Sequence, residues 1–94
     1  MPLKTKPFDA AEFLKTPEEI ADYLEEAFED GDPAFIAAAL GDAARAQGMG
    51  KIASETGLSR ESLYRALSKD GNPELATVLK VMDALGLRLK AVGH

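Results

Sequence analysis

The sequence predicts an all-α domain of five helices that ends in a short, strand-like tail. Apolar residues recur at the 3.6-residue helical period along most of the chain. Proline and glycine stand where one helix should end and the next should begin. Because 94 residues is the size of one small domain, we expect residues 1–94 to fold around a single core.

Composition excludes several classes of protein. The chain has no cysteine, which excludes disulfides and thiolate metal sites and suits a reducing compartment. No stretch approaches the roughly 20 apolar residues of a membrane span, and the N-terminus lacks the apolar core of a signal peptide. We therefore expect a cytoplasmic protein without a membrane partner.

The first half of the chain, residues 9–47, is expected to form acidic helices behind a flexible lead at residues 1–8. Eleven acids and one base, Lys15, lie between positions 9 and 42 and give that stretch a net charge of −10. Such a surface either is a plain solvated face or favours a partner that is itself basic. Asp9 can cap a short first turn that carries the apolar residues Phe13 and Leu14.

Two helices that begin with proline should follow. Thr16 can cap a helix that starts at Pro17, and Glu19 completes a capping box. Gly31 should end that helix, and Asp32-Pro33 repeats the start signal before an alanine-rich helix. The apolar stripes of the two helices are Ile20, Tyr23, Leu24, Ala27 and Phe28, then Phe35, Ile36, Ala39, Leu40 and Ala43.

Residues 48–69 have the spacing of a helix-turn-helix, although an ordinary helical hairpin would share much of it. Gly48 and Gly50 break the chain before the motif. Ala53 is small where two helices would cross, and Gly57 can end the first helix at positive φ.

The second helix of the motif is expected over residues 59–68. Leu58 would fill the corner before it, and Ser59 can cap its N-terminus. The inner face of this helix would be Leu63, Ala66 and Leu67. A helix held in this way, with a polar and arginine-bearing outer face, fits the major groove of DNA. The candidate DNA contacts are Lys51, Ser59, Arg60, Glu61, Ser62, Tyr64, Arg65 and Lys69.

The cationic candidates have distinct expected roles. Arginine reads guanine through O6 and N7, so Arg60 and Arg65 are the candidates for base contacts. Lys51 and Lys69 bracket the motif and are suited to phosphate contacts. Solvated surface cations would have the same sequence pattern.

The other candidates have competing structural roles. Ser59 is first of all a helix cap, and Ser62 could bond a phosphate or a base edge. Tyr64 could pack on a sugar or on the neighbouring helix. Glu61 could accept a bond from cytosine N4, but an ion pair with Arg65 at i+4 is favoured.

The last third of the chain predicts a turn, one helix and a tail. Asp70-Gly71-Asn72-Pro73 is a turn signal, and residues 74–85 should form a helix that ends before Gly86. Its expected inward residues are Leu75, Val78, Leu79, Met82 and Leu85. Residues 87–92 alternate between apolar and basic like a strand, and a single strand could pair with that of a second copy to form a dimer.

Charge is divided unevenly along the chain. Residues 43–94 carry eight bases and five acids, a net charge of +3, although the whole chain has a net charge of −5. Screening at physiological salt limits phosphate attraction to about 8 Å, so the acidic first half need not prevent the second half from binding DNA.

Catalytic chemistry has little support in the sequence. The only histidine is His94, and no cluster of histidine and carboxylates has metal-ligand spacing. Paired acids such as Glu18 and Glu19 sit together on one predicted helix without a cleft. We therefore expect no enzyme, no cofactor and no metal.

Three segments carry a resemblance to a known family. They are GLSRESLYRALS, DGNPELATVLKVMDALGLRL and the lead FDAAEFLKTPEEIADYLEEAFEDGDPAFIAAALGDAARAQGM. The second half resembles the Cro/C1-type, lambda-repressor-like helix-turn-helix regulators. Nearly the whole chain resembles the probable addiction-module antidotes, the antitoxins of HigA type.

This resemblance implies an antitoxin that neutralises a basic toxin of the RelE/ParE group and, as a homodimer, binds operator DNA to repress its own operon. The resemblance fails at Met49, where many Cro/C1 domains have a phosphate-anchoring glutamine. If Phe8 and Phe13 are exposed, they would anchor a partner better than the carboxylates of residues 17–30. The alternatives are a toxin-binding module that does not read DNA and a phage-type repressor without a toxin.

Overall fold

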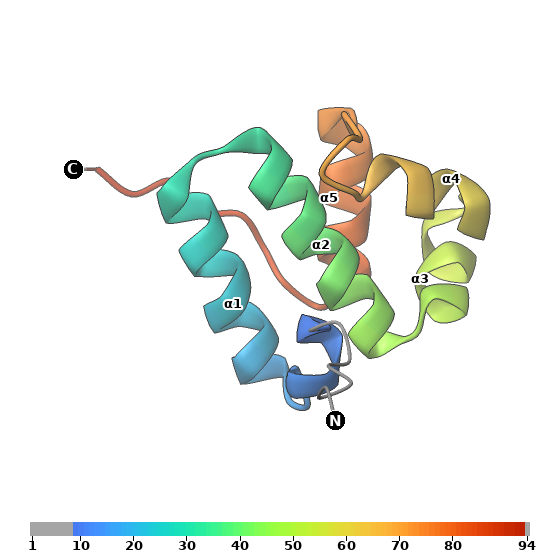
Figure 1. Ribbon diagram of the computed structural model, residues 1–94, viewed down its shortest axis with the longest axis horizontal. Helices are drawn as coiled ribbons and strands as arrows, with labels where there is room; N and C mark the ends of the chain where they lie inside the picture. The colour runs from blue at the N-terminus through green and yellow to red at the C-terminus, as the bar shows by residue number, and fades with distance from the viewer. Residues whose placement is uncertain (1–8, 94) are drawn as a thin grey trace, which may run out of the picture.

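The computed structural model describes residues 9–93, and this part of the chain is all-α as expected (Figure 1). The predicted lead at residues 1–8, Phe8 and His94 lie outside the described residues. A 3-10 turn, η1 (Ala10–Phe13), precedes five α-helices. These are α1 (Pro17–Asp30), α2 (Pro33–Gln47), α3 (Met49–Thr56), α4 (Arg60–Ala66) and α5 (Leu75–Ala84). None of the described helices has the length and apolar character needed to cross a membrane.

The helix starts confirm the predicted caps. The Thr16 hydroxyl accepts a bond from the Glu19 N–H at 3.1 Å, and the Glu19 carboxylate accepts one from the Thr16 N–H at 3.0 Å. The Asp32 carboxylate accepts a bond from the Ala34 N–H at the start of α2. Local sequence therefore determines where both N-terminal helices begin.

Helix α2 runs through the middle of the molecule and contacts η1, α1, α3 and α4 (Figure 1). It is buried over most of its circumference by small residues, which let neighbouring helices approach closely. Its buried residues are Ala37, Ala39, Leu40, Gly41, Ala43 and Ala44. The five largest fully buried side chains come one from each α-helix, Leu24, Leu40, Ile52, Leu63 and Val81, so all five helices share one core.

Gly41 permits the closest contact between α2 and the segment that ends α4. A Cβ atom at this position would overlap the backbone carbonyl oxygen of Leu67. Gly41 could not be singled out from the sequence, because nothing in the helical pattern of α2 shows which of its residues contacts the backbone of another segment. The glycine allows the end of α4 to rest directly on α2.

The predicted inner face of the last helix was partly wrong. Leu75 and Leu79 are 67% and 46% exposed, whereas Val81 is fully buried. The buried stripe is Val81, Met82 and Leu85, with Val78 partly buried beside it. Two overlapping apolar stripes were available in the sequence, and contact with α3 selects the one that contains Val81.

Residues 87–93 form no strand in the described single chain, and the strand predicted there depends on a second copy. One further expectation differs from the structure. Gly50 lies inside α3 rather than between helices, and only Gly48 separates α2 from α3. Pairing of residues 87–92 with a second copy remains a prediction.

Gly41 and Gly50 form a matched pair for testing the close contact. We expect Gly41→Ala to lower the free energy of unfolding by about 1–3 kcal/mol, because the added methyl group overpacks a backbone contact. Gly50→Ala adds the same methyl group to an open helical position and should raise the free energy of unfolding by about 0.5–1 kcal/mol. Denaturant unfolding of both variants measures the difference, and equal effects would contradict the contact.

Candidate nucleic-acid interface

A tight corner joins α3 to α4. Gly57 ends α3 with φ 77°, a left-handed conformation that costs glycine little, and its N–H donates to the Ala53 carbonyl at 3.0 Å. The buried Thr56 hydroxyl donates to the same carbonyl at 3.3 Å and accepts from the Leu58 N–H at 3.3 Å. Leu58 packs partly buried against the core. The chain therefore turns sharply at the predicted place.

Helix α4 is fixed at its start and along its inner face. The Ser59 hydroxyl accepts a bond from the Ser62 N–H at 3.0 Å, which confirms Ser59 as the cap. Leu63 is fully buried and Leu67 is 4% exposed, while Ala66 is half-buried. The helix is shorter than the predicted 59–68, because its last hydrogen-bonded turn closes when Leu67 donates to the Leu63 carbonyl.

All eight candidate DNA contacts are exposed. They come from α3, the corner, α4 and the turn that follows, and they are Lys51, Ser59, Arg60, Glu61, Ser62, Tyr64, Arg65 and Lys69. The side chain of Arg65 is 74% exposed. The buried side of α4 faces the body of the protein, so its polar side is presented outward at one end of the molecule (Figure 1).

Neighbouring acids partly offset the cations on this surface. Arg65 lies 4.0 Å from Glu61, and Lys51 lies 4.0 Å from Glu55, each one helical turn away. These distances are at the limit for an ion pair, and exposed i,i+4 pairs stabilise a helix by about 0.3–0.5 kcal/mol. Such weak pairs leave both cations available to a phosphate or a base.

Two of the hydroxyl candidates are already engaged with each other. The Ser59 hydroxyl donates to the Ser62 hydroxyl at 2.9 Å, and both lie at the start of α4. Met49 is only 5% exposed and packs in the core. It therefore presents no group to a phosphate, and Lys51 is the exposed cation on α3.

A hollow of about 440 Å³ borders α4 on the side of η1. Arg60 and Tyr64 line it from α4, and Arg45 lines it from the end of α2. Asp9 and Glu12 line the opposite wall. The side of α4 that carries Arg60 and Tyr64 thus lies beside two carboxylates, a neighbourhood that could not be predicted from the sequence.

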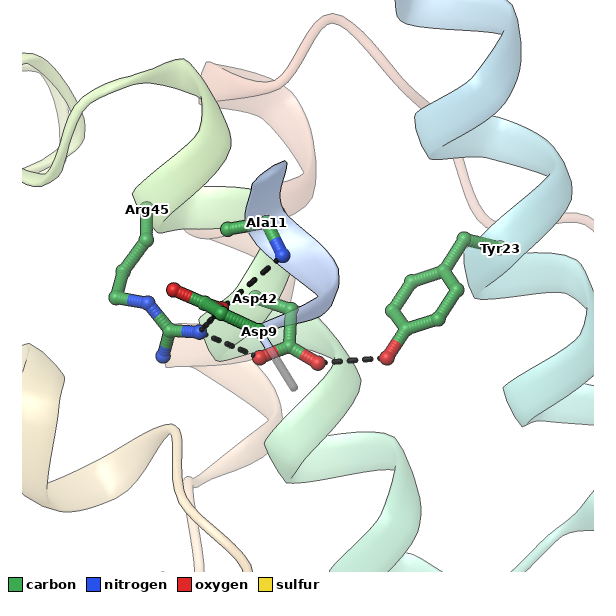
Figure 2. A network of polar contacts seen from close by, with 5 residues as sticks. All are labelled: Asp9, Ala11, Tyr23, Asp42 and Arg45. Atoms are coloured by element: carbon green, nitrogen blue, oxygen red, sulfur yellow. Dashed lines mark hydrogen bonds and ion pairs between the residues drawn. The ribbon is translucent and has the colours of Figure 1, made fainter. Parts of the chain in front are cut away.

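A network of polar contacts fixes the wall that contains Asp9 (Figure 2). The Arg45 guanidinium donates to Asp9 at 2.6 Å and to Asp42 at 2.8 Å. The Tyr23 hydroxyl donates to the other oxygen of Asp42 at 2.6 Å. These contacts join η1 and α1 to α2, and Asp9 also caps η1 by accepting from the Ala11 N–H. In the sequence, Asp42 and Arg45 could be counted only as charges. Tyr23, the partner of Asp42, is 19 positions away, and Asp9, the partner of Arg45, is 36 positions away.

The network shifts the pKa values of Tyr23 and Asp9 in opposite directions. Burial raises the pKa of Tyr23 above its usual value of 10.0, and the bond to Asp42 raises it further. The bond from Arg45 holds the pKa of Asp9 below its usual value of 3.8. Stability linked to Tyr23 is complete below pH 10.0 and is lost as the pH rises past that value. Stability linked to Asp9 is complete above pH 3.8 and is lost as the pH falls through the lowered pKa.

The described residues hold no candidate metal site. Nowhere in residues 9–93 do three histidine, cysteine, aspartate or glutamate side chains come together to hold a metal ion.

Comparison with known proteins shows the family of this chain. A family model described as "Probable addiction module antidote protein" matches residues 4–93. The chain belongs to this family. An uncharacterized protein of Haemophilus influenzae is 52% identical over 85 residues, which cover 90% of this chain and 88% of that relative. No solved structure matches the antidote-family chain significantly. The finer likeness to Cro/C1 regulators and to HigA remains a prediction.

Tyrosine titration tests the polar network. The chain has two tyrosines, so Tyr23 is the only one left in a Tyr64→Phe variant. We expect tyrosinate absorbance to appear above pH 10.0 in the folded variant and near pH 10.0 in denaturant. Adding Asp42→Asn should lower the folded pKa only partly, because burial is unchanged. Identical titration of the folded and denatured chains would contradict the network.

Proposed function

We propose that this protein is the antitoxin of a type II toxin–antitoxin module and that it also represses its own operon. Membership in the antidote family supports the first role, since an antidote implies a toxin partner. The second role is supported by one observation: the α3–α4 corner exposes every candidate DNA contact while Leu63 and Leu67 hold the other side of α4 in the core. The proposal includes no catalytic step and no cofactor, and it places the protein in the cytoplasm.

In this proposal α4 enters the major groove of operator DNA. Arg60 and Arg65 would contact base edges, and Lys51 and Lys69 would contact the phosphates on either side. Ser59, Ser62 and Tyr64 would contact the backbone or a base edge, and Glu61 would release Arg65 when DNA binds. A homodimer would place two α4 helices about 34 Å apart, so the operator should be a palindrome with half-sites one turn apart.

The arrangement of the helices reduces repulsion between the acidic half and DNA. Helix α1, with seven acids and no base, lies at the opposite end of the molecule from α4 (Figure 1). The longest dimension is 49 Å, several times the screening length of about 8 Å at physiological salt. DNA bound at α4 would thus be affected mainly by the nearer acids Asp9, Glu12, Glu55 and Glu61.

Burial of Met49 favours a second candidate, a toxin-binding module whose corner no longer reads DNA. Met49 supplies no phosphate contact at the start of α3, and both Lys51 and Arg65 lie within 4.0 Å of an acid. Measurement of DNA affinity separates this candidate from the first.

Two substitutions distinguish base reading from phosphate contact. We expect Arg60→Ala to lower the preference for operator over random DNA by about 1–3 kcal/mol, because a bidentate base contact is lost. Lys51→Ala should weaken binding to all DNA alike and reduce the slope of log affinity against log salt by about one. Gel-shift titrations on the DNA upstream of its gene, at two salt concentrations, measure both effects.

Arg88→Ala is the matched control, because Arg88 is exposed on the tail and does not line the hollow beside α4. It should leave operator preference and the salt slope unchanged. Failure of the wild-type protein to bind its upstream DNA more tightly than random DNA would favour the second candidate.

The antitoxin role is tested separately by co-expression. We expect the small protein encoded beside this gene to arrest growth when expressed alone and to be harmless when this chain is co-expressed. The two proteins should also purify as one complex. Arrested growth despite co-expression, or no arrest by the neighbouring protein alone, would contradict the antitoxin role.

A further inference from the structure

A groove of about 630 Å³ runs between α1 and the tail that follows α5. Its floor is apolar and consists of Leu24 and Phe28 from α1, Met82 from α5 and Leu87 from the tail. The groove volume lies within the range of roughly 300–1,000 Å³ that is typical of binding sites. The tail passes behind α2 and α1 and leaves the molecule beyond the end of α1 (Figure 1).

The tail wall of the groove is exposed and has unused bonding groups. Leu89 and Val92 are 42% and 78% exposed although both line the groove. The Leu87 N–H donates to the Met82 carbonyl at 2.9 Å, and after that bond residues 88–93 make no hydrogen bond within the described part of the chain. An extended peptide laid along this wall would find both apolar contacts and backbone donors and acceptors.

The α1 wall of the groove is acidic, whereas the tail wall carries two bases, Arg88 and Lys90, that form no ion pair with α1 among residues 9–93. Glu25 and Glu29 lie one turn apart on the α1 wall, and neither has an ion-pair partner among residues 9–93. They belong to a helix of seven acids without a base, in which acids four residues apart repel each other by about 0.2–0.5 kcal/mol per pair. A bound cation would relieve this repulsion.

We propose that this groove is the docking site for the toxin, which would insert a segment that combines apolar and basic side chains. The inference rests on the proposed antitoxin function and gives that function a location. The apolar side chains of the segment would cover Phe28, Leu89 and Val92, and its lysines or arginines would pair with Glu25 and Glu29.

The negative charge of α1 favours a basic toxin segment over other occupants of the groove. DNA and an anionic membrane would be repelled by α1. In a second copy of the chain, the bases that line the groove are only Arg88 and Lys90, and they lie beside another acidic α1. A segment with basic and apolar side chains complements both the acidic α1 wall and the apolar floor of the groove.

The location has a consequence for repression. The groove lies against α1, at the opposite end of the molecule from α4 (Figure 1). Toxin in the groove would leave the α3–α4 corner open, so one chain could hold toxin and DNA at the same time.

Charge reversal with a matched control tests the groove, and the probe is the small protein encoded beside this gene. We expect Glu25→Lys with Glu29→Lys, and separately Leu89→Asp, each to raise the Kd for that protein at least about tenfold. Asp22→Lys with Glu26→Lys reverses the same number of charges at the same spacing on α1 but outside the groove. This control should change the Kd by less than about threefold, and circular dichroism checks that each variant folds.

The outcomes separate the groove from the antitoxin function. If both charge-reversal pairs weaken binding of the neighbouring protein equally, α1 acts only by general electrostatic steering and the groove is not the docking site. Tight binding by all variants would also contradict the groove as the docking site. If wild-type protein does not bind the neighbouring protein, the antitoxin function fails together with this inference. If the groove variants instead change the oligomeric state measured by sedimentation, the occupant is a second copy and the toxin proposal is wrong.

Discussion

The end of α4 rests on α2 at Gly41, and the direction of the candidate DNA-binding face depends on this contact. Leu63 and Leu67 fix the inner side of α4 in the core, but they do not by themselves set its distance from α2. Direct contact between the backbone of α2 at Gly41 and the backbone of Leu67 sets that distance, because Gly41 has no Cβ atom to keep the two apart. Protein interiors are packed too tightly for a small shift to remain local. The α3–α4 corner is therefore held by the central helix as well as by its own turn.

The fold also keeps its charges apart. Helix α1 carries seven of the sixteen acids of the chain at one end of the molecule, whereas the exposed cations of α3 and α4 lie at the other (Figure 1). A net charge of −5 would disfavour nucleic-acid binding if the charges were mixed. Separation over a distance longer than the screening length lets one small chain present surfaces of opposite character. The separation is partial, because Asp9 and Glu12 reach the hollow beside Arg60 from η1, and Arg88 and Lys90 line the groove beside α1.

Sequence patterns predicted the features that depend on neighbouring residues. Thr16, Asp32 and Ser59 cap helices as expected, because a cap needs only a side-chain oxygen and the next turn of backbone. The Gly57 corner and the exposure of all eight candidate contacts followed from spacing as well. The patterns did not predict the Tyr23–Asp42–Arg45–Asp9 network or the groove, since both join segments that are distant along the chain.

The sequence alone determined the helical class, the caps that start α1, α2 and α4, the corner and the division of charge, because each arises from local propensity or from composition. Only the tertiary structure decided which stripe of α5 is buried, since Leu75 and Leu79 are as apolar as Val81 and contact with α3 makes the choice. The tertiary structure likewise placed Leu87, Leu89 and Val92 along a groove beside α1. A strand needs a partner in space, and period-two alternation along a single chain cannot supply one.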